Sequence, residues 1–129
     1  MLYKILITTL MCFSFINMSG QTRQDFKSVD VKHFEAAVAD TSYVVLDVRT
    51  QEEHNEGHIP GTHFNIDVLE ESFLEEALKL LPKDKYVALY CRSGNRSKTA
   101  AKILSENGYE VLELATGFRG WSAAGKMTE

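Results

Sequence analysis

The sequence predicts an α/β fold with a central, mostly parallel sheet of about five strands and helices on both faces. Two observations predict this class. Short, continuous apolar runs alternate along the chain with segments whose apolar residues recur at helical spacing. The runs do not alternate apolar with polar residues, which is typical of parallel strands buried on both faces. A chain of 129 residues with 44% hydrophobic residues is long enough for one such domain.

Strands and helical segments alternate in the first half of the predicted domain. The run Tyr43–Leu46 is apolar and β-branched at its centre, and it therefore indicates a buried strand. Asp30 can cap the start of the helix that precedes this strand, because its carboxylate accepts hydrogen bonds from the first free N–H groups of the helix. In order, we expect a short edge strand at Phe26–Ser28, a helix with Val31, Phe34, Ala37 and Val38 on one face, the strand Tyr43–Leu46, a short acidic helical turn from Thr50 to Gly57, and a weaker strand over Gly61–Ile66.

The second half repeats the alternation. The run Tyr86–Tyr90 indicates the central strand, and the pair Asn107-Gly108 is a stop signal for the helix after it. In order, we expect an amphipathic helix with Phe73, Leu74, Ala77, Leu78 and Leu81 on its apolar face and Pro82 at its end, the strand Tyr86–Tyr90, a helix with Ser97, Ala100, Ala101 and Leu104 on a small-residue face, a strand over Glu110–Leu114, and a short helix over Gly117–Ala124.

The N-terminus has the layout of a secretory signal peptide. Lys4 precedes the apolar stretch Ile5–Ile16, and small and polar residues follow it. A membrane-spanning helix would need about 20 apolar residues, and this stretch is shorter. We therefore expect a signal peptide over residues 1–20, a linker over 21–25 and the folded domain over 26–129. Localisation would be periplasmic or secreted, without stable membrane insertion after cleavage.

Charge and cysteine content narrow the function classes. Removal of residues 1–20 leaves 13 basic and 18 acidic residues, a net charge of −5, which argues against nucleic acid as a partner. The same cleavage leaves Cys91 as the single cysteine, so an intramolecular disulfide is impossible. The four histidines are scattered, and with one cysteine they give no metal-site spacing. We therefore expect no metal and no cofactor.

The run Cys91-Arg92-Ser93-Gly94-Asn95-Arg96-Ser97 joins the central strand to a helix-like segment. Backbone N–H groups in such a turn lack internal partners and point into a small cup, which stabilises an anion or a thiolate. Arg92 and Arg96 add positive charge beside the sulfur, and Gly94 permits backbone angles closed to other residues. These features predict a reactive thiol with a lowered pKa rather than an inert buried cysteine.

Three segments in order resemble a single-domain rhodanese, a thiosulfate sulfurtransferase-like protein, across nearly all of residues 26–124. The segments are Leu46-Asp47-Val48-Arg49 with Glu53 and Gly57-His58-Ile59-Pro60-Gly61, the loop that begins at Cys91, and Gly117-Phe118 with Trp121. His54, Thr62 and Thr116 depart from the family pattern, but none touches the thiol chemistry.

The resemblance implies that Cys91 attacks the outer sulfur of a small anionic donor such as thiosulfate and forms a persulfide. A nucleophilic acceptor, cyanide or a thiol, then takes the sulfur. The residues support this chemistry independently, since a thiolate is the nucleophile and Arg92 can neutralise the sulfite that leaves. The residues expected to form the loop around the sulfur are Arg92, Ser93, Gly94, Asn95, Arg96 and Ser97.

Supporting roles fall to residues outside the loop. Arg49 and Glu53 are four residues apart and are expected to form an ion pair with each other. Asp47 lies at the tip of a strand, where it can brace neighbouring loops or contribute to the site; we favour bracing. His58 could act as a base for Cys91 in a Cys–His hydrolase, but the resemblance makes it a structural histidine.

Two other functions remain open on sequence. A sulfur-relay or redox-interaction module would hand the persulfide or a mixed disulfide to a protein partner instead of turning over small molecules. Phosphatases and arsenate reductases of related architecture form the second class. Their loops place one residue more between cysteine and arginine, whereas four residues separate Cys91 from Arg96 here. The shorter loop fits a sulfur atom better than a tetrahedral oxyanion.

Overall fold

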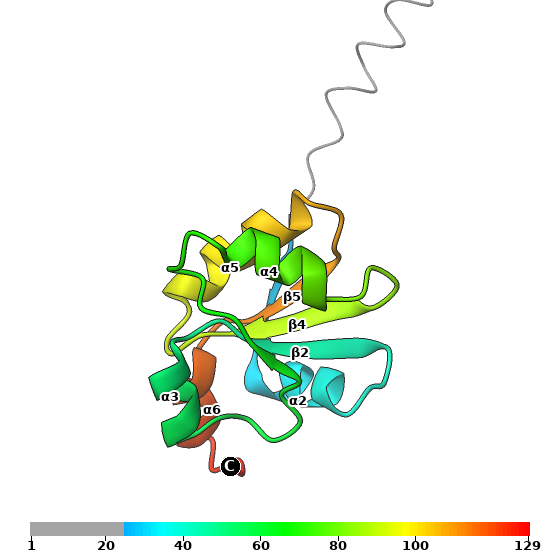
Figure 1. Ribbon diagram of the computed structural model, residues 1–129. Coiled ribbons are helices and arrows are strands. Elements are labelled where there is room, and N and C mark those ends of the chain that lie inside the picture. The colour runs from blue at the N-terminus through cyan, green and yellow to red at the C-terminus, as the bar shows by residue number, and fades with distance from the viewer. Residues whose placement is uncertain (1–24) are drawn as a thin grey trace, which may run out of the picture.

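Five parallel strands in the order β1-β5-β4-β2-β3 form the centre of the molecule in a computed structural model that describes residues 25–129 (Figure 1). All four strand pairs are parallel. The strands are β1 (Lys27–Val29), β2 (Tyr43–Asp47), β3 (Phe64–Asn65), β4 (Tyr86–Tyr90) and β5 (Val111–Leu114), and the helices are α2 (Val31–Val38), α3 (Gln51–Glu56), α4 (Phe73–Leu80), α5 (Asn95–Ser105) and α6 (Gly117–Ala123). The predicted fold class is confirmed.

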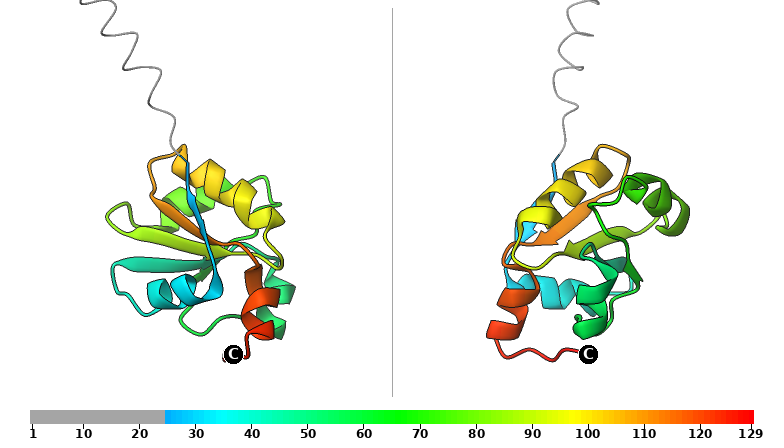
Figure 2. Two further views of the ribbon diagram at one scale, coloured as in Figure 1. Left: turned by 180° about the vertical axis from the view of Figure 1, so that it is seen from behind. Right: turned by 60° about the vertical axis from the view of Figure 1, so that its left-hand side comes forward.

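Helices cover both faces of the sheet (Figures 1 and 2). On one face, α4 and α5 pack their apolar residues, such as Phe73 and Leu104, against the side chains of β2 and β4. On the other face, Phe34 of α2 and Trp121 of α6 pack against Val45 and Tyr90. This two-sided burial explains why the strands are continuous apolar runs.

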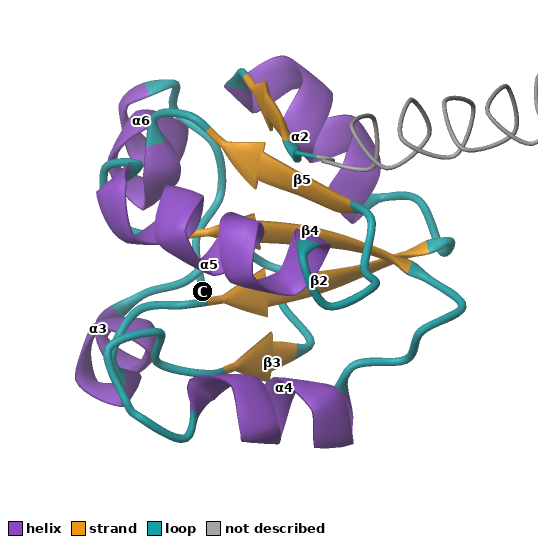
Figure 3. Cartoon of the chain, turned by 90° about the horizontal axis from the view of Figure 1, so that it is seen from above, coloured by secondary structure: helices purple, strands orange, loops and turns teal. Residues whose placement is uncertain are grey.

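All strands point the same way, so their carboxyl ends meet at one edge of the sheet, on the side of α3 and α6 (Figure 3). Ligands of open α/β sheets bind at this edge, because the loops that leave the strands converge there. Cys91 directly follows β4, the strand between β2 and β5, and it therefore lies at the centre of the edge.

Some predicted boundaries and one predicted core residue are wrong. The weak strand expected over Gly61–Ile66 shrinks to Phe64–Asn65, because the ring of His63 accepts the Val45 N–H group at 2.9 Å in place of a ladder carbonyl. The edge strand lies at Lys27–Val29, one residue later than expected, in register with β5. The helical spacing predicts Leu78 on the buried face of its helix, yet this side chain is 45% exposed.

The predicted signal peptide over residues 1–20 lies outside the described residues, and so does all of the predicted linker except Asp25. Within residues 25–129, the helices are all too short or too polar to cross a membrane.

Candidate active site

The loop after β4 holds Cys91 and bends sharply at Gly94. Gly94 has a φ of 111°, in the left-handed region that favours glycine. A Cβ atom at this position would lie 2.3 Å from the carbonyl oxygen of Ala115, so only glycine fits. This bend aims the Gly94 N–H group at Cys91 Sγ, with an N–S distance of 3.1 Å. Helix α5 begins directly afterwards at Asn95.

The surroundings of the sulfur favour the thiolate. Burial of Cys91, which is 1% exposed, raises the pKa of the thiol. The Ser97 hydroxyl and the N–H groups of Ser97, Gly94 and Ser93 lower it by stabilising the negative charge, and their combined effect wins. The net pKa therefore lies below that of an ordinary thiol, in the direction that makes a nucleophile at neutral pH.

Arg96 is held by Glu53 in a two-pronged ion pair. Its Nη1 and Nη2 atoms lie 2.8 Å and 2.9 Å from the two carboxylate oxygens of Glu53. Glu53 in turn closes the N-terminus of α3, because it accepts the Thr50 N–H group while its own N–H group donates to the Thr50 hydroxyl. The expected pair between Arg49 and Glu53 is therefore wrong, and Glu53 instead anchors the cysteine loop to α3.

Asp47 takes the place of Glu53 as the partner of Arg49. The Arg49 guanidinium lies 2.7 Å from Asp47, and the same Nη2 atom donates to the carbonyl oxygen of Gly57 at 2.7 Å. Asp47 is fully buried and also contacts His54 Nδ1 at 3.0 Å. Asp47 rather than Glu53 pairs with Arg49 because a fully buried carboxylate needs a directly bonded cation. These contacts brace the loop after β2.

His58 lies on the side of this cluster that faces the C-terminal segment. Its ring stacks on His54 with the centroids 4.0 Å apart, and its Nδ1 atom lies 3.0 Å from the His54 carbonyl oxygen. Backbone hydrogen bonds of 2.9 Å and 3.0 Å join His58 to Glu129. All of these contacts connect parts of the scaffold.

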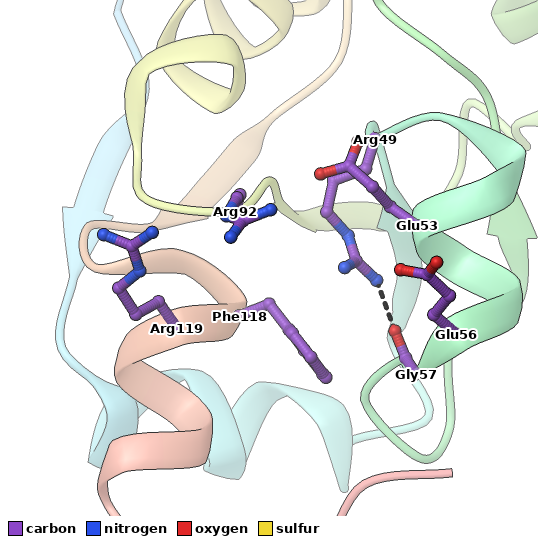
Figure 4. Close-up of a pocket in the computed structure, with 7 residues that line it drawn as sticks. All are labelled: Arg49, Glu53, Glu56, Gly57, Arg92, Phe118 and Arg119. Atoms are coloured by element: carbon purple, nitrogen blue, oxygen red, sulfur yellow. Dashed lines mark hydrogen bonds between the residues drawn. The ribbon is translucent and has the colours of Figure 1, made fainter.

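An open pocket of about 340 Å³ lies beside the cysteine loop (Figure 4). Arg92, which follows Cys91, and Arg119 of α6 both line it, and both side chains are exposed. Among the ion pairs within residues 25–129, none involves Arg92 or Arg119, so both charges are available to a ligand. The lining residues are Arg49, Glu53, Glu56, Gly57, Arg92, Phe118 and Arg119.

Backbone hydrogen bonds fasten α6 to the cysteine loop. The Phe118 N–H group donates to the Cys91 carbonyl oxygen at 2.8 Å, and the Arg119 N–H group donates to that of Arg92 at 2.9 Å. This close approach requires Gly117, because a Cβ atom there would lie 2.5 Å from Arg92. Arg92 and Arg119 are thus held side by side from segments that are far apart in the sequence.

The structure brings together most of the predicted loop. Cys91, Gly94 and Ser97 are buried, Arg96 is partly buried, and Arg92, Ser93 and Asn95 are exposed. Sequence reasoning missed Glu56 and Arg119 of the pocket and did not assign Phe118 to the site. For Phe118 and Arg119, the only signal in the sequence was their position directly after Gly117, in the segment Gly117–Trp121 that resembles the C-terminal motif of the family. No cluster of metal-ligating side chains occurs in residues 25–129.

Comparison with known proteins identifies the family of this fold and site. A family model described as a rhodanese-like domain matches residues 30–124. The chain belongs to the rhodanese-like domain family.

Individual relatives agree with this assignment. A sulfurtransferase of Allochromatium vinosum is 36% identical over 99 residues, which cover 75% of this chain and 89% of that protein. The thiosulfate sulfurtransferase GlpE of Coxiella burnetii is 36% identical over 97 residues, 72% of this chain and 86% of the relative. The crystal structure of a rhodanese-related protein from Thermoplasma volcanium superposes with a TM-score of 0.70 at 31% identity, and the match covers 81% of this chain and 98% of that one.

Proposed function

We propose that this chain is a sulfurtransferase in which Cys91 carries the transferred sulfur as a persulfide. The observation that carries the proposal is the hydrogen bond of 3.1 Å from the Gly94 N–H group to Cys91 Sγ, in a loop that lowers the pKa of the thiol. The family and the names of the sulfurtransferase relatives support the same reaction class.

The proposed sulfur donor is thiosulfate, and the reaction runs in two steps. The Cys91 thiolate attacks the outer sulfur of thiosulfate, so that a new S–S bond forms. The bond between the two donor sulfurs breaks, and its electron pair leaves with sulfite. An acceptor such as cyanide then attacks the outer sulfur of the persulfide and leaves as thiocyanate. This second step regenerates the thiolate.

The pocket beside the loop suits an anionic donor. Arg92 and Arg119 supply two positive charges toward thiosulfate and the departing sulfite, and they outnumber the single carboxylate of the lining, Glu56, that takes part in none of the ion pairs within residues 25–129. Because Cys91 is only 1% exposed, the donor must present a small terminal atom to the sulfur. A terminal sulfane sulfur meets this requirement.

The length of the cysteine loop argues against a phosphatase or arsenate reductase. Four residues separate Cys91 from Arg96, one fewer than in the loops of those enzymes. The two N–H groups that Arg96 donates to Glu53 hold the short loop in place, and the other three remain free to face an acceptor. The short loop favours sulfur over a tetrahedral oxyanion.

Mass spectrometry of the purified chain after incubation with thiosulfate tests the proposal. We expect one additional sulfur atom on Cys91, which cyanide removes as thiocyanate, and neither product with Cys91→Ser. Arg92→Ala and Arg119→Ala should each raise the KM for thiosulfate. The matched control is Lys79→Ala, which removes an equal charge from an exposed position on α4.

The outcome also separates the other candidate functions. Sulfur uptake without thiocyanate formation would favour the relay module, which hands sulfur to a protein partner. Robust hydrolysis of aryl phosphates, with no sulfur ever found on Cys91, would overturn the assignment.

We also propose that the chain is exported and that residues 1–20 are removed. The order of Lys4, apolar stretch and small polar residues supports this proposal. N-terminal sequencing of protein from the envelope fraction should begin near Gln21, whereas an intact Met1 in a membrane pellet would contradict export.

A further inference from the structure

Glu56 is a carboxylate of the pocket beside the cysteine loop, and it takes part in none of the ion pairs within residues 25–129. The other lining carboxylate, Glu53, is bound to Arg96. Glu56 is exposed and is the last residue of α3. The carbonyl groups at the C-terminal end of a helix disfavour a negative charge, so the stability of α3 does not explain this residue. An anionic sulfur donor does not explain it either, because a carboxylate repels such a donor.

The ring of Phe118 connects the two sides of the pocket. The hydrogen bond from the Phe118 N–H group to the cysteine loop fixes its backbone, and the Arg49 guanidinium lies 4.5 Å from the centre of its ring. The same ring approaches Gly57, where a Cβ atom would lie 3.4 Å from it. Gly57 follows Glu56 and Arg119 follows Phe118, so the C-terminal end of α3 and the start of α6 lie on two sides of one aromatic ring (Figure 4).

The pocket therefore presents free charges of both signs. Arg92 and Arg119 supply two positive charges and Glu56 supplies one negative charge, and within residues 25–129 none of the three is paired with another. A ligand with an anionic and a cationic group can contact both sides. A dianion such as thiosulfate contacts only the arginines and is repelled by Glu56, so the two kinds of ligand are distinguished by this carboxylate.

We propose that the pocket selects, as the sulfur acceptor, a small thiol that carries both an ammonium and a carboxylate group, and that Glu56 binds the ammonium group. This selectivity rests on the sulfur-transfer role of Cys91 proposed above. The carboxylate of the acceptor takes the place of the departed sulfite at Arg92 and Arg119. An amino-acid thiol such as cysteine fits, because its thiol and its two charged groups extend from adjacent carbon atoms. The volume of about 340 Å³ is within the range of small-molecule sites.

The transfer step needs no further reactant. The acceptor sulfur attacks the outer sulfur of the Cys91 persulfide, and a new S–S bond forms. The bond between that outer sulfur and Cys91 Sγ breaks, and its electron pair returns to Sγ as the thiolate. The thiol proton of the acceptor passes to the outer sulfur. The products are the persulfide of the amino-acid thiol and the free Cys91 thiolate.

Two acceptors that differ by a single ammonium group test the proposal. Cysteine and 3-mercaptopropionate share the carbon chain, the thiol and the carboxylate, but only cysteine has the ammonium group. On protein loaded with sulfur from thiosulfate, Glu56→Gln should lower the rate constant for sulfur removal by cysteine about fivefold. The rate constant for 3-mercaptopropionate should rise about twofold, because its repulsion by the carboxylate is lost. Loading by thiosulfate should become faster for the same reason.

Two control variants separate the position of the charge from its presence. Glu52→Gln removes an exposed charge from the same helix at a position outside the pocket lining, and it should leave the ratio of the two rate constants unchanged. Glu56→Asp keeps the charge and should retain most of the preference for cysteine. The intrinsic reactivity of each thiol is the same toward every variant, so the change in the ratio reports on Glu56 alone.

Protection of Cys91 from iodoacetamide tests the same binding site without any sulfur transfer. Serine has the charged groups of cysteine but no thiol, and 3-hydroxypropionate also lacks the ammonium group. Serine should slow the alkylation of wild-type Cys91 more than 3-hydroxypropionate does. In Glu56→Gln, the two compounds should protect Cys91 equally.

An unchanged ratio of the two acceptor rate constants in Glu56→Gln would overturn the proposal, and so would an equal loss with both thiols. A chain that takes up sulfur but shows no dependence on Glu56 in either measurement would refute only this inference. A chain that takes up no sulfur, yet is protected by serine in a manner that depends on Glu56, would refute the proposed function and leave the binding site in place.

Discussion

The ion pair between Glu53 and Arg96 should be a measurable part of the stability of this protein, and Glu53→Gln tests it. The pair connects α3 to the cysteine loop through two hydrogen bonds of 2.8 Å and 2.9 Å. Glutamine preserves the shape of the side chain and can still accept the Thr50 N–H group, which Glu53 accepts at 3.1 Å. The substitution therefore removes the charge while it retains most of the helix cap.

The pKa of Glu53 gives the size of the effect. Hydrogen bonding to Arg96 is the main reason that this pKa falls from 4.5 to about 2, with burial opposing the change. A shift of this size corresponds to about 3 kcal/mol of stability at neutral pH. The Glu53 side chain is 20% exposed, and screening by water reduces the expected loss in Glu53→Gln to about 2 kcal/mol.

The sign of the pH dependence follows from the lowered pKa. The contribution is fully present above pH 4.5, where Glu53 is ionised in both states, and it is lost as the pH falls toward 2. The difference between wild type and Glu53→Gln should therefore shrink by about half between pH 7 and pH 3.

Urea unfolding measures the difference in the free energy of unfolding between wild type and Glu53→Gln. The fluorescence of Trp121 reports on it, because Trp121 is the single tryptophan and is only 4% exposed. The matched control is Glu52→Gln, which removes an exposed charge from the same turn of α3 and should change stability by less than about 0.5 kcal/mol. Equal stabilities of the two variants at pH 7, or a gap that does not depend on pH, would refute the reasoning.

Three further predictions concern the loop and its supports. Gly94→Ala should lower the free energy of unfolding in urea by more than about 2 kcal/mol and abolish sulfur uptake, because its Cβ atom would meet the Ala115 carbonyl. Gly125 is also at positive φ but faces open space, so Gly125→Ala should lower the free energy of unfolding by less. Tyr90→Phe should destabilise the fold by about 1–2 kcal/mol in the same assay, because the buried Ile59 N–H group loses the phenol oxygen that it donates to at 3.1 Å; a neutral effect would contradict this role. Alkylation of wild-type Cys91 should show a midpoint below the roughly 8.5 of a free thiol, since the donors around the sulfur outweigh its burial, and a midpoint at or above that value would show that the thiol is not activated.

Local patterns in the sequence were sufficient to predict the fold and the position of Cys91 between a strand and a helix. The run Tyr86–Tyr90 followed by Cys91 and Gly94 predicts a strand, a tight turn and a helix from neighbouring residues alone. The capping box from Thr50 to Glu53 is likewise a contact between residues three apart. Such features depend on backbone preferences and short-range hydrogen bonds, which the order of residues encodes directly.

The partners of the charged residues were decided by the tertiary structure. Spacing along a helix favoured a pair between Arg49 and Glu53, but the fold brought Arg96, in the first turn of α5, to Glu53, 43 residues away in the chain. Arg49 then remained with Asp47, whose complete burial required a cation.

Local sequence contained no signal for the contact between Glu113 and Ser97, and the only signal for Arg119 was its position near Gly117. Arg119 reaches the pocket only because α6 docks on the carbonyl groups of the cysteine loop, and Glu113 meets Ser97 only because β5 lies beneath α5. The sequence by itself thus determined the turn that surrounds Cys91, the proposed nucleophile, since this turn follows from adjacent residues. Only the folded chain decided which charges surround that nucleophile, because electrostatic partners are chosen by proximity in space and by the free energy of burying each charge.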